Sequence, residues 1–302
     1  MDETQNAIKT LSAGAIAGIV SRSVTSPLER LKVMKQVQSQ NDKFNGIGKA
    51  LVRMYREDGL RGFWRGNGAN IIRVAPMSAI QFAAFAKYKK LMSGNTQEIT
   101  LFETFCAGAL SGMTASIICY PLDFMRSLLS VQTSSNQHYK GIIPSMVMIV
   151  RTKGPGALYR GLLSTLAGVA PYIAINMTAF DILKHQYLPQ NRNAPYFMLI
   201  NLGLGAAAGS VAAAATYPTD VIRRRMQLQG LEGCHDLPQY RNAFHCITHT
   251  LRTEGVGGLY KGLVPCFMKV IPSMAIAFTT FEFLKHHMGF DSNKMEKAPS
   301  SS

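Results

Sequence analysis

The sequence predicts an all-α membrane protein, in which six transmembrane helices in three repeats form a barrel around a central cavity. Charged residues make up 16% of the 302 residues, whereas soluble domains carry about 25%. Charge is absent from three long segments, 104–122, 161–180 and 194–219, and each segment approaches the roughly 20 residues that cross a bilayer as a helix. One set of motifs also occurs three times, which indicates a repeat architecture.

The first half of each repeat carries two glycines four residues apart and a proline nine residues later. The second half opens on an aromatic–basic–glycine triplet and reaches another proline ten residues after the glycine. The first-half positions are Gly14, Gly18 and Pro27; Gly108, Gly112 and Pro121; Gly205, Gly209 and Pro218. The second-half positions are Trp64, Gly66 and Pro76; Tyr159, Gly161 and Pro171; Tyr260, Gly262 and Pro272. These copies predict repeats 1–95, 96–192 and 193–302 within one domain.

Each repeat is expected to contain two spanning helices joined by a loop with a short amphipathic helix. The expected spans are 7–38, 68–91, 101–132, 162–187, 195–229 and 263–288, and the expected short helices are 46–57, 141–152 and 242–253. Glycines four apart let helices approach closely in lipid. Three similar hairpins should close a ring, inside which the charges at Arg22, Glu29, Arg73 and Lys269 are sheltered from lipid.

The odd-numbered spans share the pattern Pro-x-acid-x-x-base. The acid and base are Glu29 and Lys32, Asp123 and Arg126, and Asp220 and Arg223. Because residues three apart lie on one helix face, each pair could form within its own helix. The proline can instead kink the helix, so that each acid meets the base of a neighbour and three ion pairs close one end of the barrel.

The even-numbered spans end in a second pattern, aromatic-acid-x-x-base. Asp181 with Lys184 and Glu282 with Lys285 fit it, whereas the first copy has Lys89 but Ala86 in place of the acid. A second ring that lacks one pair is therefore expected at the opposite end. Two rings at opposite ends would allow alternating access to a central site.

With these motifs in triplicate over about residues 8–288, the chain resembles the mitochondrial carrier family. The resemblance implies a multi-pass protein of the mitochondrial inner membrane with matrix-side short helices. It also implies that the odd-helix charges form a matrix gate and the even-helix charges a cytoplasmic gate. The glutamines that brace the matrix gate in the family match Gln36 and Gln227, but Ser130 stands at the third position. Lys153 replaces the family's acid before Gly154, so a linking salt bridge is not expected there.

A substrate position is predicted three residues before each even-helix proline, where the copies carry Arg73, Gly168 and Lys269. Two cations at membrane depth favour an anion. Glycine leaves room for a flat group to approach the backbone. Val169 adds an apolar wall, and Tyr172 can stack on a ring or donate a hydrogen bond. Together these residues predict a site for an anion with a planar group.

The pair Gly168–Val169 is similar to the glycine–aliphatic pair of carriers for adenine-containing substrates, which implies that Arg73 and Lys269 bind phosphates. Arg22, two turns before Glu29, matches a cavity residue of the ADP/ATP carrier. The run Arg223 to Met226 resembles that carrier, but it continues as in coenzyme A carriers. We therefore expect an antiporter of phosphorylated, adenine-nucleotide-type solutes, with coenzyme A, ADP, ATP and AMP all open. An ATP-Mg/phosphate carrier, a thiamine pyrophosphate carrier and a proton-leak or channel-like protein remain alternatives.

The aromatic–basic–glycine triplets lie at predicted helix N-termini, where backbone N–H groups can hold phosphate. They resemble the family's cardiolipin sites, which implies lipid binding at Arg65 and Gly66, Arg160 and Gly161, and Lys261 and Gly262. Interfacial anchoring by the aromatic and basic side chains is the alternative.

Enzyme activity is not expected, because the chain has no GxxxxGK[ST] phosphate loop, catalytic triad or metal-ligand pattern. The five scattered cysteines suggest neither a disulfide framework nor a zinc site. Cationic residues inside the spans argue against nucleic-acid binding. We expect a monomer without a metal or cofactor, whose partners are a small anionic solute and membrane lipid, cardiolipin above all.

Overall fold

The computed structural model describes residues 2–38, 46–93, 100–134, 137–187, 197–232 and 237–287, and all of its regular elements are helices. The six long helices are α1 (Asp2–Val37), α3 (Asn67–Ser93), α4 (Leu101–Val131), α6 (Leu162–Tyr187), α7 (Phe197–Leu228) and α9 (Leu263–His287). They match the expected spans within a few residues, although positions 195, 196 and 288 lie outside the described residues. The predicted repeat boundaries, 95/96 and 192/193, also lie outside them.

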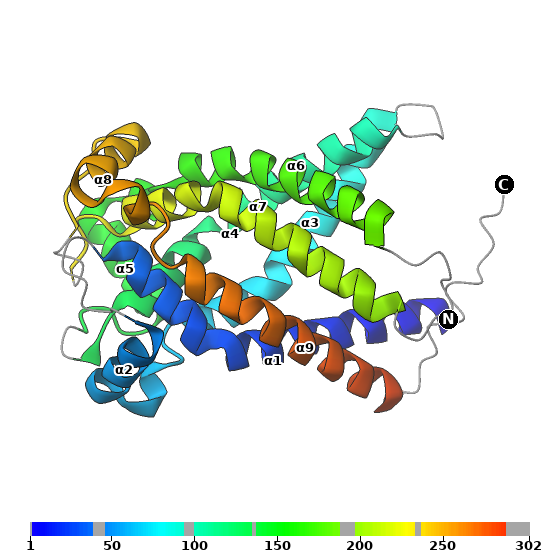
Figure 1. Cartoon of the computed structure of the whole chain (residues 1–302), viewed down its shortest axis with the longest axis horizontal. Coiled ribbons are helices and arrows are strands. Elements are labelled where there is room, and N and C mark those ends of the chain that lie inside the picture. Colours follow the sequence, from blue (N-terminus) through cyan, green and yellow to red (C-terminus); the bar gives the residue numbers. More distant parts are fainter. Residues whose placement is uncertain are drawn as a thin grey trace.

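The long helices form a closed ring. The most extensive contacts join α3 to α4, α6 to α7 and α1 to α9, and smaller ones join α1 to α3, α4 to α6 and α7 to α9. Figure 1 shows these helices running along the longest axis of the molecule. The first and last helices are therefore neighbours, and the three-repeat helical barrel is confirmed.

Short helices cap the end of the barrel opposite the start of α1 and the end of α9 (Figure 1). They are α2 (Ile47–Gly62), α5 (Ile142–Lys153) and α8 (Ala243–Gly258). α2 and α8 run beyond their expected ends because each turns at a glycine with positive φ, Gly59 at 67° and Gly255 at 68°, and then continues as helix. In the second repeat this continuation is the 3₁₀ helix η2 (Pro155–Tyr159).

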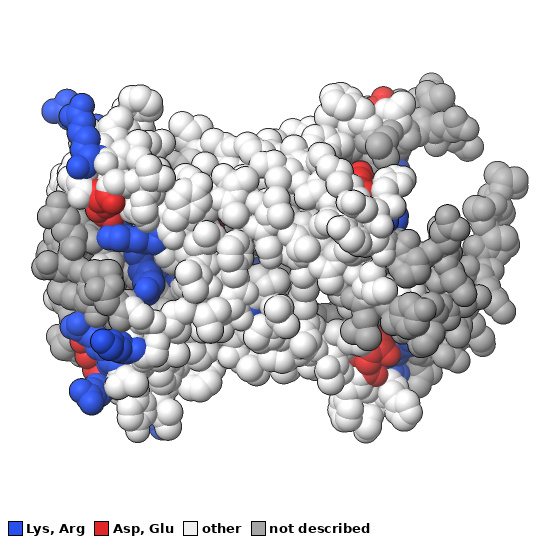
Figure 2. All heavy atoms as spheres, in the orientation of Figure 1, with Lys and Arg blue, Asp and Glu red and all other residues white. Residues whose placement is uncertain are grey.

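The middle of the barrel surface is largely apolar. On the face drawn in Figure 2, a band with almost no charge lies between two ends that carry charged residues. Among the described residues, four segments are long and apolar enough to cross a membrane: Asn67–Met92, Phe102–Val131, Pro155–Tyr187 and Leu263–His287. At most 28% of the apolar window in any of them is buried within the protein. An apolar surface of this extent is typical of contact with lipid.

The proline of α1 leaves a carbonyl that another helix end satisfies. Pro27 has no N–H, so the carbonyl of Ser23, four residues earlier, loses its helical partner. The indole Nε1 of Trp64 donates to that carbonyl at 2.8 Å. The first residue of an aromatic–basic–glycine triplet thus ties the start of α3 to the proline turn of α1.

A buried arginine fastens α2 to α1 and α4. The side chain of Arg30 is 1% exposed and its partner Asp58 is fully buried, with 2.5 Å between the guanidinium and the carboxylate. Arg30 also donates to the carbonyls of Gly62, Ser130 and Gln132 at 2.7–3.0 Å. Burial opposes ionisation of Asp58, but the hydrogen bond and charge of Arg30, together with hydrogen bonds from Ser134, outweigh burial and hold the pKa of that carboxyl below its usual value.

The third repeat uses a different position for the same contact. Arg225, which is fully buried, pairs with Glu254 at 2.6 Å, but it lies seven residues after its proline, whereas Arg30 lies three after Pro27. In the second repeat Leu128 occupies the position of Arg225, and Lys153 occupies the position of the acid. Lys153 instead donates to the carbonyl of Gly230 in the third repeat, and the described chain gives it no carboxylate partner.

Asp58→Asn should destabilise the protein, because it leaves Arg30 buried without a counter-charge, which costs about 3–5 kcal/mol. The measurement is the thermal unfolding midpoint of detergent-solubilised protein. Glu57→Gln is the matched control on the same helix, since it removes an exposed pair with Arg53, worth below about 1 kcal/mol.

The effect of Asp58→Asn should depend on pH. Because the folded pKa of Asp58 is lowered, its stabilisation is complete above the unfolded pKa of about 3.9 and is lost as pH falls below it. Equal midpoints for the two variants at pH 7 would contradict the structural role of the buried pair.

Candidate functional site

Three interhelical ion pairs join α1, α4 and α7, the odd-numbered spans of the sequence, near the end capped by α2, α5 and α8. We call them the matrix ring, after the matrix gate that the family resemblance implies. Lys32 Nζ of α1 lies 3.0 Å from Asp220 Oδ2 of α7. Arg126 of α4 contacts Glu29 of α1, and Arg223 of α7 contacts Asp123 of α4. Every carboxylate therefore meets the base of another helix and not the base three residues away on its own helix.

In two of the three pairs, the base lies against the ring of a tyrosine whose hydroxyl is hydrogen-bonded to a glutamine. Lys32 lies 5.2 Å from the ring centre of Tyr217, whose hydroxyl accepts from Gln36 Nε2 at 3.2 Å. The guanidinium of Arg223 lies 5.7 Å from the ring centre of Tyr120, whose hydroxyl accepts from Gln227 Nε2 at 2.9 Å. A cation over an aromatic face is stabilised by the ring quadrupole.

Sequence reasoning missed both tyrosines, although each directly precedes the odd-helix proline of its repeat. Each also stacks on the aromatic residue of its own triplet, Tyr120 on Tyr159 at 6.0 Å and Tyr217 on Tyr260 at 6.3 Å. The first repeat has Ser26 at this position, so comparing the three copies there is the signal that could have found them.

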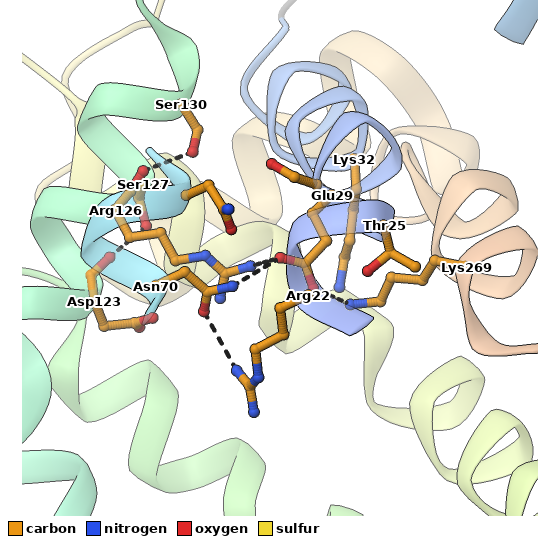
Figure 3. A network of polar contacts seen from close by, with 12 residues as sticks. Arg22, Thr25, Glu29, Lys32, Asn70, Asp123, Arg126, Ser127, Ser130 and Lys269 are labelled. Atoms are coloured by element: carbon orange, nitrogen blue, oxygen red, sulfur yellow. Dashed lines mark hydrogen bonds and ion pairs between the residues drawn. The ribbon is translucent and has the colours of Figure 1, made fainter. Parts of the chain in front are cut away.

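Glu29 gathers more partners than a single ring base (Figure 3). Besides Arg126, its carboxylate accepts from Lys269 Nζ at 2.7 Å and from Asn70 Nδ2 at 3.4 Å. Asn70 Oδ1 in turn accepts from Arg22 Nη1 at 3.3 Å. Two residues predicted to bind substrate, Lys269 and Arg22, are thus connected to a ring acid. Asn70, which was not predicted, makes the second connection.

A cavity of about 190 Å³ lies beside the ring. Gly168, Val169 and Tyr172 of α6 line it together with Lys32 and Asp220. A Cβ on Gly168 would lie 2.7 Å from Thr219 Oγ1 of α7, so the glycine is required for this close approach of α6 and α7. The structure therefore brings the predicted glycine, aliphatic and tyrosine positions together at one hollow.

Arg73 of α3 has no carboxylate partner in the described chain. Its Nη1 lies 3.0 Å from the sulfur of Met77, and its buried Nε has no hydrogen-bond partner. Arg224, which was quoted in a motif but not assigned a role, donates to Ser127 and, at 2.9 Å, to Gln227. Its nearest carboxylate oxygen, on Asp123, is 3.8 Å away and already pairs with Arg223.

Cations outnumber acids among these residues. The carboxylates are Glu29, Asp123 and Asp220, and the cations are Arg22, Lys32, Arg73, Arg126, Arg223, Arg224 and Lys269. Four cations therefore exceed the charge of the ring acids. At membrane depth such an excess favours binding of a polyanion.

The charges near the ends of α3, α6 and α9, which the sequence predicted to form a second ring, do not form one among the described residues. Lys89, Asp181 and Lys184 are exposed, and Glu282 and Lys285 are partly exposed. Where the chain is described, none of the five pairs with another of them. In the described part of the chain, ion pairs thus join the long helices near α2, α5 and α8, whereas these five charges form no second ring.

The triplet cations differ between repeats. Arg65 lies 3.3 Å from Asp58, and Lys261 lies 2.7 Å from Glu254, so both pair with the acids that hold the buried arginines. Arg160 instead lines a cavity of about 480 Å³ with Lys153 and Arg241. A cavity lined by three cations, two from the second repeat and one from the third, therefore lies at the start of α6.

The triplet glycines serve close helix packing. Gly66, Gly161 and Gly262 have φ of 81°, 80° and 92°, which favours glycine. A Cβ on Gly66 would lie 2.3 Å from Ser130 Oγ of α4. A Cβ on Gly161 would lie 3.0 Å from the carbonyl oxygen of Arg223 in α7, and a Cβ on Gly262 would lie 2.9 Å from that of Lys32 in α1. Each even helix therefore starts against an odd helix of a neighbouring repeat.

Reversing one ring charge should damage transport more than reversing a pair. Lys32→Glu places two carboxylates together, and an unpaired buried charge costs about 3–5 kcal/mol. We expect uptake near background for Lys32→Glu and partial recovery for Lys32→Glu with Asp220→Lys, measured in liposomes. Equal loss in the single and double variants would argue against the interhelical pair.

Comparison with known proteins identifies the family of this chain. The family model described as "Mitochondrial carrier protein" matches residues 3–96, 97–191 and 194–292. The chain is 37% identical to the mitochondrial adenine nucleotide transporter ADNT1 of Arabidopsis thaliana, over 94% of this chain and 88% of that protein. It is 38% identical to the human mitochondrial adenyl nucleotide antiporter SLC25A24, over 93% of this chain and 58% of that protein.

A zebrafish relative, the calcium-binding mitochondrial carrier protein SCaMC-2-B, is 35% identical over 93% of this chain and 60% of its own length. The chain thus spans most of the plant relative but less than two thirds of these two animal ones. Three family-model matches and an all-helical barrel agree with the sequence motifs. The chain belongs to the mitochondrial carrier family, and it is a multi-pass transport protein of the mitochondrial inner membrane and not an enzyme.

Proposed function

We propose that this protein exchanges adenine nucleotides across the inner membrane by alternating access. Two observations together carry the proposal: cations exceed acids around the ring, and a hollow lined by Gly168, Val169 and Tyr172 shares Lys32 and Asp220 with that ring. The cations supply partners for the phosphates of a nucleotide, and the hollow supplies a slot for its base. Relatives that bear adenine nucleotide names support the same class.

In this proposal Arg73, Lys269 and Arg22 hold phosphate groups, and Tyr172 contacts the base. The matrix ring and Gln36 and Gln227 form the gate on the matrix side. Lys89, Asp181, Lys184, Glu282 and Lys285 form the gate on the cytoplasmic side. The conformation described here would then be closed to the matrix and open to the cytoplasm. Opening the matrix ring without substrate leaves charges unpaired, so net movement of the empty carrier is slow and exchange is favoured.

Coenzyme A is a second substrate within the same proposal, because it contains adenine and a diphosphate. The sequence Gln227-Leu228-Gln229 after the arginine run favours it. Direct comparison of coenzyme A with ADP, ATP and AMP distinguishes the two substrates.

We further propose that the triplets at the starts of α3, α6 and α9 hold phospholipid phosphates, with cardiolipin as the lipid. Of the three triplets, the one at Arg160 is the best candidate, because it lines a cavity with Lys153 and Arg241. Among the described residues Arg160 has no carboxylate partner, whereas Arg65 and Lys261 pair with acids. The protein is proposed to act as a monomer.

Purified protein in liposomes should take up labelled ADP much faster when the liposomes contain ADP than when they are empty. The exchange mechanism predicts this because a substrate inside the liposome supplies partners for the ring charges during the return step. The empty carrier would have to make that step with those charges unpaired. Phosphate, thiamine pyrophosphate and dicarboxylates in the lumen serve as comparison counter-substrates. Equal uptake into empty and loaded liposomes would contradict exchange and favour a channel-like protein.

Arg73→Ala should weaken ADP binding by more than tenfold, because a charge-assisted hydrogen bond is worth about 1.5–3 kcal/mol. Gly168→Leu should abolish it by filling the base slot against Thr219. Gly203→Leu is the matched control, since a Cβ at Gly203 meets no atom within 4 Å. The readout is the ligand-induced shift of the melting temperature, which reports binding even when transport fails. Unchanged ADP binding by Gly168→Leu would remove the base slot from the proposal.

A further inference from the structure

The three pairs of the matrix ring are not equivalent, because the Glu29–Arg126 pair lacks the tyrosine and the glutamine of the other two. Ser26 stands before its proline, and Ser130 stands where the other copies have glutamine. Ser26 Oγ donates to the carbonyl of Phe63 at 3.2 Å, and Ser130 Oγ donates to the carbonyl of Arg126 at 2.7 Å. Both hydroxyls are bonded to backbone and leave the ion pair without this support.

The same pair is the one tied to the substrate cations. Lys269 of α9 lies 2.7 Å from Glu29, and Asn70 of α3 joins Glu29 to Arg22 (Figure 3). Asp220 has Lys32 as its ion-pair partner, and Asp123 has Arg223 with Arg224 at 3.8 Å. Within the described chain, Glu29 is thus the ring acid bonded to residues proposed to hold phosphate.

We propose that Glu29 is the positioning residue through which an anionic substrate opens the matrix ring, and that the ring opens first between α1 and α4. This inference rests on the proposed nucleotide function. A phosphate that binds Lys269 competes with Glu29 for the same ammonium group. Once Lys269 turns to the phosphate, Glu29 retains Arg126 and the weak contact from Asn70. The pair without tyrosine or glutamine is then the weakest of the three.

Competition for Lys269 has a measurable consequence for affinity. While Lys269 is held by Glu29, the site is not fully ready for substrate, and the apparent affinity is reduced by the fraction of protein that is ready. Glu29→Gln keeps the shape of the side chain and removes the charge that holds Lys269. It should therefore bind ADP more tightly, although it breaks the ring.

Removing the other partner should act in the opposite direction. Arg126→Gln leaves Glu29 with Lys269 as its remaining cation, so Lys269 is held more firmly and substrate binding weakens. A merely structural role of the pair predicts the same direction for Glu29→Gln and Arg126→Gln, because both open the ring. Tighter ADP binding in Glu29→Gln with weaker ADP binding in Arg126→Gln is therefore specific to competition for Lys269.

The experiment measures ADP dissociation constants for the purified full chain by thermal-shift titration. Asp220→Asn and Lys32→Gln are the matched controls, because they break an equivalent pair whose acid has no bond to a proposed phosphate ligand. We expect Glu29→Gln to bind ADP roughly tenfold more tightly than wild type. Arg126→Gln should bind at least about fivefold more weakly than Lys32→Gln, and Asp220→Asn should show no tightening.

Two results would overturn the inference while the proposed function stands. In the first, wild-type protein binds ADP, but the Glu29→Gln variant binds ADP no more tightly than the Asp220→Asn variant does. The other is a gain in Glu29→Gln that survives the added change Lys269→Gln, because the gain must come from Lys269. If Glu29→Gln does not fold, Arg126→Gln against Lys32→Gln decides the question. Failure of ADP and coenzyme A to shift the wild-type melting temperature would instead overturn the proposed function, and this inference with it.

Discussion

Three ion pairs between helices are the interaction on which the rest of this structure depends. Carboxylates at Glu29, Asp123 and Asp220 lie in helices that lipid surrounds, where an unpaired charge is costly. Each is neutralised by a base from a different helix, so the charges are tolerated only while the odd helices stay together at this end. A transporter needs that kind of contact, because it is strong when formed and can be replaced when a charged substrate supplies new partners.

The frame around the ring is asymmetric, although the repeats that build it are similar. Repeats one and three anchor their short helices with a buried arginine and an acid, whereas repeat two has Leu128 and Lys153 at those positions. The tyrosines that support the ring come from repeats two and three, Tyr120 and Tyr217, and the glutamines come from repeats one and three, Gln36 and Gln227. Ser26 and Ser130 stand at the two remaining positions, beside the Glu29–Arg126 pair. A substrate with phosphates at one end and an aromatic base at the other is itself asymmetric. The protein can recognise it at the positions where the three repeats differ.

Charge balance links the ring to the cavity. Lys269 belongs both to the ring and to the proposed substrate site, because it pairs with Glu29 and is one of the residues proposed to hold phosphate. Binding and gating therefore draw on the same charges. Within the described residues, the charges predicted for the second ring do not pair with one another, which agrees with a carrier in which one ring is formed at a time.

The sequence by itself determined the helices, the three repeats and the positions of the ring residues, because hydrophobic length and repeat spacing are local properties of the chain. It also predicted a substrate position at Arg73, Gly168 and Lys269, since the repeats provide equivalent positions for comparison, and that role stays a prediction. Only the tertiary structure decided which base meets which acid, that Lys269 bonds Glu29, that Asn70 links Arg22 to it, and that Arg30 reaches Asp58 from an unexpected position. These contacts cross between helices, and the tilt and rotation of packed helices set their distances. No pattern along one helix contains that information.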